Sequence, residues 1–199
     1  MRASLLTCLL SAGLAAFAAA AEEPAAPKAP SPQQVARGTL VMKNLEIGSY
    51  SPILDQMHHP ATDTEAENAE DRRAISVAFQ FLSTRFGKLE GFELAQGPVD
   101  CVCVSLGMGP DEYWAKDAET DRGAAVAFTT RYSKIHAGIV RITETNRGRG
   151  WIRSIEFGVP PTVPGAKEQV TRITREMIAR MQSVTRKPKS GSAPAPKPE

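Results

Sequence analysis

The apolar residues of this chain follow a helical period in its first part and a period of two further on. Between Gln33 and Glu46 they recur at mixed three- and four-residue steps and stop just before Gly48. This spacing predicts a first helix. A short helical turn is expected next, with Pro52 at its start, where the fixed φ of proline suits a helix.

The second predicted helix has the clearest pattern. Thr64 and Glu67 have the spacing of a capping box, and acidic residues gather in the opening turns, where they complement the helix dipole. Gly87 is a typical terminator. We therefore expect a long helix that is buried over a wide face. Its apolar stripe is Ile75, Phe79, Leu82 and Phe86.

Beyond Gly87 the period of two is typical of half-buried strands. Because sequential strands with short links pair with their neighbours, we expect an antiparallel meander. A meander preceded by helices is an α+β fold, here with N-terminal helices packed on a curved sheet. The acidic segment from Met108 to Arg122 is expected to be a connection. The five expected strands are Lys88–Ala95, Val99–Leu106, Ala124–Tyr132, Ala137–Thr145 and Trp151–Gly158.

A C-terminal amphipathic helix is expected within residues 161–186, after prolines that stop the sheet. Its arginines lie mostly off the apolar stripe. A basic amphipathic helix can lie on an anionic membrane surface. The alternative, which we favour, is that the stripe packs on the rest of its own domain. The stripe comprises Val170, Ile173, Met177, Ile178, Met181 and Val184.

The ends of the chain indicate export. Residues 1–21 have the features of a cleavable signal peptide: Arg2 supplies positive charge, an apolar stretch follows, and small residues precede Glu22. A membrane anchor is the alternative, but the stretch is largely alanine, which is only marginally apolar. Residues 22–32 form a Pro/Ala linker and residues 187–199 a similar tail, both expected to be disordered. The domain proper is residues 33–160, and we expect a periplasmic or secreted protein.

Charge adds little to this picture. The formal net charge is +2, with acidic residues in excess in the first part of the chain and basic residues in the second. Such asymmetry can indicate nucleic acid or an anionic surface. It is equally produced when two halves fold together and their charges intersperse. Export and the lack of a recognisable binding module argue against nucleic acid.

Cys101 and Cys103 are the cysteines that remain after signal removal. If both belong to a strand, their Cα atoms lie about 6.6 Å apart on one face, near the upper limit for a bridge. Three interpretations stay open: free thiols packed as small apolar groups, a reducible disulfide, or soft metal ligands. Together with His58 and His59 the cysteines would form an N/S site for copper or zinc.

Other candidate chemistry is limited. Asp55 and His58 have a spacing that allows an acid–base pair. Tyr50, Trp114 and Tyr132 are the candidate ligand-pocket residues. No phosphate-binding glycine loop, nucleophile elbow or zinc-protease motif is present, and no cofactor is predicted.

In this order, the elements resemble the nuclear transport factor 2-like superfamily of cone-shaped α+β domains over residues 33–160. The resemblance is carried by Gly48-Ser49-Tyr50 after the first helix, by Phe86-Gly87-Lys88-Leu89 before the first strand, and by the cadence of the last two strands. It implies a curved sheet around a long helix, with a conical pocket. Some members are isomerases, dehydratases or cyclases, and many exported ones serve as binding modules. The terminal helix lies outside the usual pattern.

From these features we expect an exported binding or interaction module without a catalytic site. We expect it to form a homodimer through the outer sheet face, which would carry Arg131, Arg141 and Arg153. One alternative is a small-molecule enzyme, isomerase- or dehydratase-like, that uses the cone pocket. Another is a thiol- or metal-handling periplasmic protein centred on Cys101 and Cys103. The ligand or partner is not specified by the sequence.

Overall fold

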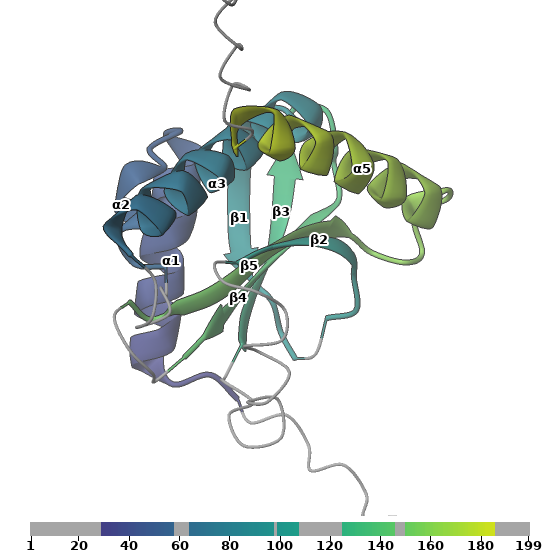
Figure 1. Ribbon diagram of the computed structural model, residues 1–199. Coiled ribbons are helices and arrows are strands. Elements are labelled where there is room, and N and C mark those ends of the chain that lie inside the picture. The colour runs from purple at the N-terminus through teal and green to yellow at the C-terminus, as the bar shows by residue number, and fades with distance from the viewer. Residues whose placement is uncertain (1–28, 58–63, 98, 108–124, 146–149, 186–199) are drawn as a thin grey trace, which may run out of the picture.

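The computed structural model describes residues 29–57, 64–97, 99–107, 125–145 and 150–185. Within them the chain is an α+β protein with an open, five-stranded antiparallel sheet and helices gathered on one side (Figure 1). The expected fold class is confirmed at this level. The expected signal peptide and C-terminal tail, together with His58, His59 and the connection from Met108 to Arg122, lie outside the described residues.

Helix α1 spans Pro32–Glu46 and begins with a capping box that joins Ser31 and Gln34. The backbone N–H of Gln34 donates to the Ser31 hydroxyl (3.3 Å), and the backbone N–H of Ser31 donates to the Gln34 side chain (2.7 Å). Gly48 follows with a φ of 70°. The short helix α2, Ser51–Leu54, comes next, with Pro52 in its first turn. Both were expected, α1 from the spacing of its apolar residues and α2 from Pro52 at its start.

Helix α3, Glu65–Phe86, has the predicted capping box. Thr64 accepts from the Glu67 backbone N–H (3.2 Å), and the Glu67 carboxylate accepts from the Thr64 backbone N–H (2.8 Å). That second bond lowers the pKa of Glu67. The helix ends at Gly87, whose φ is 89°. A Cβ there would also collide with the Ser133 side chain, so only glycine fits.

The sheet contains β1 (Leu89–Leu94), β2 (Val102–Gly107), β3 (Ala125–Tyr132), β4 (Gly138–Glu144) and β5 (Ile152–Val159), in the order β1-β3-β4-β5-β2. The expectation of a simple meander was therefore wrong. Only β3, β4 and β5 pair in sequence order, while β2 pairs with β5 at the edge opposite β1. The strands themselves lie where the alternation predicted.

The segment 95–101, which connects β1 to β2, explains why β2 lies at the far edge of the sheet. This segment leaves β1 at one edge of the sheet and reaches β2 at the other. Val99 and Asp100 line the same surface hollow as Ala127 of β3 and Arg141 of β4. The described residues of this connection, on either side of position 98, therefore lie on the outer face of the sheet, away from the helices.

The core lies between the inner sheet face and helices α1 and α3. Its largest fully buried side chains include Phe79, Phe86 and Phe128. Helix α5, Ala166–Thr185, packs against α3 and β2 (Figure 1). Ala166, Val170, Ile173 and Met177 are buried in that contact, whereas Ile178, expected in the same stripe, is 44% exposed. No helix among the described residues has the length and apolarity needed to cross a membrane.

Candidate functional site

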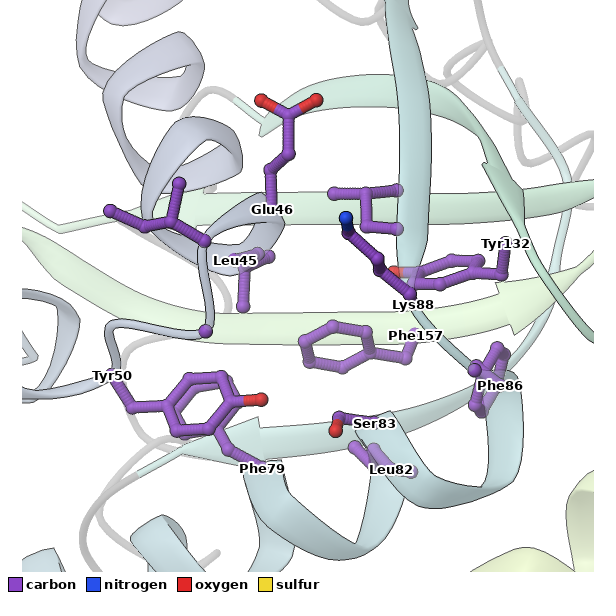
Figure 2. Close-up of a pocket in the computed structure, with 14 residues that line it drawn as sticks. Leu45, Glu46, Tyr50, Phe79, Leu82, Ser83, Phe86, Lys88, Tyr132 and Phe157 are labelled. Atoms are coloured by element: carbon purple, nitrogen blue, oxygen red, sulfur yellow. The ribbon is translucent and has the colours of Figure 1, made fainter.

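A pocket of about 350 Å³ opens between the end of α1, the inner face of α3 and the sheet (Figure 2). The turn after α1 places Tyr50 in the wall of the pocket. Helix α3 contributes lining residues at three- and four-residue steps, which share one face of the helix. Most of the lining is apolar. It consists of Leu45, Glu46, Ile47, Gly48, Tyr50, Phe79, Leu82, Ser83, Phe86, Gly87, Lys88, Leu89, Tyr132 and Phe157.

The walls of the pocket are built from aromatic pairs. The rings of Tyr50 and Phe79 stack, with centroids 5.1 Å apart and planes 7° from parallel. Phe79 also meets Phe157 edge to face at 5.9 Å, and Phe86 meets Tyr132 at 5.4 Å. Such contacts hold each ring in a fixed orientation. The pocket is therefore a preformed apolar surface that keeps its shape.

The Tyr132 hydroxyl is buried and has no hydrogen-bond partner among the described residues. The residue is only 6% exposed. Burial raises the pKa of Tyr132; the neighbouring Thr130 hydroxyl, which is also buried and has no partner at normal hydrogen-bond distance, acts in the opposite direction, and Tyr50 adds slightly to the rise. An unpaired buried hydroxyl costs about 1–3 kcal/mol. Because the Tyr132 oxygen has almost no accessible surface, a ligand in the pocket does not reach it, and Tyr132 contributes its ring to the pocket wall.

Polar groups surround the pocket at its outer side. Ser83 and Lys88 are exposed, and Glu46 is half-buried. In Figure 2 the Tyr50 hydroxyl and the Ser83 side chain lie below the Phe157 ring, and the Glu46 carboxylate points away from the rings. This distribution gives a pocket with an apolar interior and a mixed-charge mouth.

The structure brings together two of the three predicted pocket residues. Tyr50 and Tyr132 line the same pocket, although 82 positions separate them in the chain. Trp114 lies outside the described residues. Sequence reasoning missed Ser83 and Lys88 as lining residues. The signal for Ser83 was its position four residues after Phe79, on the same side of α3.

Asp55 does not line this pocket. Its carboxylate pairs with the Arg72 guanidinium at 2.5 Å on the surface, where the Asp55 side chain is 55% exposed. Its expected partner His58 lies outside the described residues, as does His59. Met57, the neighbour of these histidines, is fully buried in the core. The described part of the chain thus gives Asp55 a surface ion pair with an arginine.

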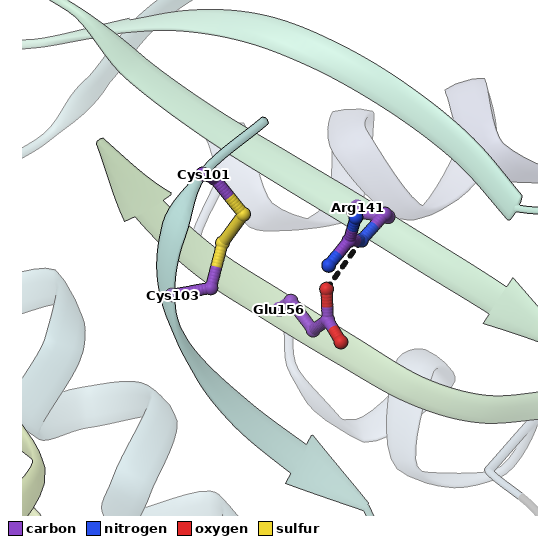
Figure 3. The surroundings of a disulfide bond; sticks show 4 residues. All are labelled: Cys101, Cys103, Arg141 and Glu156. Atoms are coloured by element: carbon purple, nitrogen blue, oxygen red, sulfur yellow. Dashed lines mark hydrogen bonds and ion pairs between the residues drawn. A yellow bond between two sulfur atoms is a disulfide. The ribbon is translucent and has the colours of Figure 1, made fainter. Parts of the chain in front are cut away.

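Cys101 and Cys103 form a disulfide (Figure 3). Of the three interpretations left open by the sequence, the structure contains this one. Strand β2 begins only at Val102, so Cys101 is free of the extended geometry that would separate the two residues. Their Cα atoms lie 5.5 Å apart, inside the usual range for a bridge. Both cysteines are half-buried.

An ion pair lies beside the disulfide. Arg141 of β4 donates from Nε to the Glu156 carboxylate of β5, its cross-strand neighbour (Figure 3). One carboxylate oxygen of Glu156 and the two sulfur atoms all lie within 4.8 Å of one another. The structure therefore places a carboxylate beside the two cysteines. This group of three residues was not predicted from the sequence.

The arginines expected on the outer sheet face are engaged in contacts. Arg131 pairs with Glu90 of β1 at 3.8 Å, and Arg141 pairs with Glu156. Arg153 also has an interaction partner. Part of this face lies next to the crossing segment 95–101. A partner that docks there would meet a surface of paired charges.

Comparisons of the chain with protein-family models, curated proteins and solved structures give no match.

Proposed function

We propose that this protein is an exported binding module whose pocket holds a small, mainly apolar molecule with one hydrogen-bonding group. The observation that carries the proposal is the apolar pocket itself, walled by paired aromatic rings and flanked by the exposed Ser83 and Lys88. A polar group of the ligand can bond to these exposed side chains while its apolar part lies against the rings. Burial of the ligand's apolar surface against the surrounding rings supplies the rest of the binding free energy.

The size and lining of the pocket support this class of ligand. Its volume of about 350 Å³ falls in the range of small-molecule sites, about 300–1,000 Å³. Such sites are mostly apolar with a few placed polar groups, and here those groups are Tyr50, Ser83 and Lys88. A planar molecule of one or two rings matches the stacked aromatic walls.

The same lining supports binding over catalysis. Among the described residues that line the pocket there is no histidine, cysteine or aspartate, and Glu46 is the one carboxylate. General acid–base chemistry most often uses a histidine or a carboxylate within hydrogen-bond reach of the reacting atom. The Glu46 carboxylate points away from the apolar interior, where the ligand would lie (Figure 2).

Export to the periplasm, a nuclear transport factor 2-like relationship and self-association are part of this proposal. The features of residues 1–21 support export. A long helix over a curved antiparallel sheet, with a pocket between them, is consistent with the nuclear transport factor 2-like relationship. The outer sheet face remains our proposed surface for a homodimer.

The proposal is tested by titrating the chain with 1-anilinonaphthalene-8-sulfonate and following the fluorescence of this probe. We expect one saturable site. The Ser83→Trp variant fills the mouth of the pocket from an exposed helix position, and it should weaken binding about tenfold or more, the effect of a steric block of over 1.4 kcal/mol. Gln80→Trp is the matched control, since Gln80 is exposed on the same helix and does not line the pocket.

Equal probe binding by the Ser83→Trp and Gln80→Trp variants would place the probe elsewhere on the protein and contradict the proposal. Absence of saturable binding by the unmodified chain would contradict it as well. Both variants need the same unfolding midpoint as the parent chain, because a loosened core also binds this probe.

A further inference from the structure

We propose that Cys101 and Cys103 are an exchangeable dithiol–disulfide couple that reacts with external thiols while the domain stays folded. This activity goes beyond the proposed ligand binding and uses a different part of the molecule. The disulfide lies at the start of β2 on the outer side of the sheet, whereas the ligand pocket lies under α3.

The bridge adds little to the free energy of unfolding of the domain. It joins residues two positions apart, so Val102 alone lies between the cysteines. The chain-entropy contribution of a disulfide grows with the loop that it closes, and this loop is among the shortest that a bridge can close. The hydrophobic core is complete without the sulfur atoms, since neither cysteine belongs to it. A bridge that does not staple the fold can open without unfolding it.

The sulfur atoms of the bridge are also accessible to an external thiolate. Both cysteines are half-buried, and they lie where the crossing segment 95–101 meets β2, an edge strand of the sheet. Thiol–disulfide exchange needs in-line approach of a thiolate to one sulfur atom. A core disulfide denies that approach, but an edge position leaves one side open to solvent.

A carboxylate and a guanidinium lie beside the sulfur atoms of the bridge. The Glu156 carboxylate lies within 4.8 Å of both, and the Arg141 guanidinium pairs with it (Figure 3). A nearby carboxylate disfavours a thiolate, and a nearby guanidinium favours one. The pair therefore sets how readily a cysteine leaves as thiolate, because a leaving thiol of lower pKa departs faster. Glu156 is a positioning residue in this sense and does not react itself.

The thiolate of an external dithiol attacks one cysteine sulfur, a mixed disulfide forms, and the other cysteine leaves as a thiolate that takes up a proton. The second thiol of the reagent then attacks the mixed disulfide and releases the first cysteine, which is protonated in turn. Two electrons and two protons pass to the protein, and the external dithiol becomes a disulfide.

The test uses the full chain with Cys8→Ser, which leaves Cys101 and Cys103 as its cysteines. The oxidised protein is treated with dithiothreitol at neutral pH, without denaturant and with a chelator present. Thiols are trapped by alkylation and counted by intact mass, and circular dichroism follows the fold. We expect both thiols to appear while the spectrum is unchanged, and oxidised glutathione to restore the bridge. A bridge that opens only in denaturant, or a fold that is lost on reduction, would overturn the proposal.

Three variants separate an exchange site from a merely accessible bond. Glu156→Gln removes the negative charge beside the sulfur atoms, so we expect reduction about threefold faster, together with a lower thiol pKa. Arg141→Gln leaves that carboxylate unpaired and should slow reduction by a similar factor. Glu90→Gln is the matched control: it breaks a cross-strand Glu–Arg pair at the opposite edge of the same sheet. Equal rates in Glu156→Gln, Glu90→Gln and the parent would overturn the proposed role of Glu156.

Discussion

Arg37 of α1 binds the buried Glu144 of β4 across 107 positions of sequence. Its Nε donates to one carboxylate oxygen at 3.1 Å, and its Nη2 donates to the other. The guanidinium also lies over the Trp151 ring, 5.0 Å from the centroid. This contact fixes the first helix against the far end of the sheet and so helps to position the pocket, which the end of that helix lines.

We expect the Arg37→Met variant to lose about 2 kcal/mol of the free energy of unfolding, because it leaves the Glu144 carboxylate buried and unpaired. The loss is smaller than for a fully buried pair, since the Arg37 side chain is 34% exposed. Denaturant unfolding measures it. In the double variant Arg37→Met/Glu144→Gln the unpaired charge is gone, and more than half of the loss should return. A double variant that loses the sum of both single effects would show that the pair is not the cause.

Tyr132→Phe removes the unpaired buried hydroxyl and keeps the ring. We expect the free protein to gain about 1 kcal/mol in the free energy of unfolding, because the variant no longer buries a polar group without a partner. Ligand binding should change little, because the ring that lines the pocket is kept and the hydroxyl is out of reach of a ligand there. Titration of both proteins with 1-anilinonaphthalene-8-sulfonate measures this. A loss of affinity of more than about tenfold, or 1.4 kcal/mol, would show that the hydroxyl does contact the ligand.

The same residue makes stability depend on alkaline pH. Burial raises the pKa of Tyr132 above its ordinary value of 10.0, which applies in the unfolded chain. The free energy of unfolding of the parent is therefore unaffected by the titration of this group below pH 10. It falls as the pH rises from there toward the folded-state pKa, because only the unfolded chain then loses the Tyr132 proton readily. The slope reaches about 1.4 kcal/mol per pH unit. Unfolding at pH 9 and near pH 11 should show the advantage of Tyr132→Phe over the parent growing with pH, and a constant advantage would contradict this reasoning.

The sequence predicted the helices and strands well because their signals are local. Capping residues such as Thr64 and the terminating Gly87 act within one turn, and alternation marks strands regardless of their partners. The position of β2 could not be predicted, since no local residue pattern states that segment 95–101 crosses the sheet. The bond between Cys101 and Cys103 depended on a detail of one residue, namely whether Cys101 belongs to the strand.

The candidate site was predictable only in part for the same reason. Tyr50 and Tyr132 carry a ring and a hydroxyl, which made them candidates from composition alone. That the Tyr132 hydroxyl is buried depends on tertiary packing, which no local residue pattern indicates. Asp55 shows the reverse: its chemistry fitted a catalytic pair, but helix α3 brings Arg72 to it instead.

Gly158 of β5 provides the last prediction, because it faces Cys103 across the strand pair. A Cβ at this position would lie 2.6 Å from the Cys103 sulfur and closer still to the Val102 carbonyl oxygen. Two of the three nearest contacts are with backbone atoms, which cannot give way as the end of a flexible side chain can, so we expect Gly158→Ala to cost about 1–3 kcal/mol through overpacking. Denaturant unfolding of the oxidised protein measures it.

Gly91→Ala is the matched control for this variant. Gly91 is also a strand glycine, but its nearest contact for a Cβ is the end of the Arg131 side chain at 3.5 Å, an ordinary packing distance. It should therefore change stability by less than about 0.5 kcal/mol. If Gly158→Ala is as stable as Gly91→Ala, the bridge and β5 are less closely packed than the structure has them. If the cost of Gly158→Ala falls when Cys103 is also replaced by alanine, the sulfur is the group that requires glycine there, and β5 is shaped to hold the bridge.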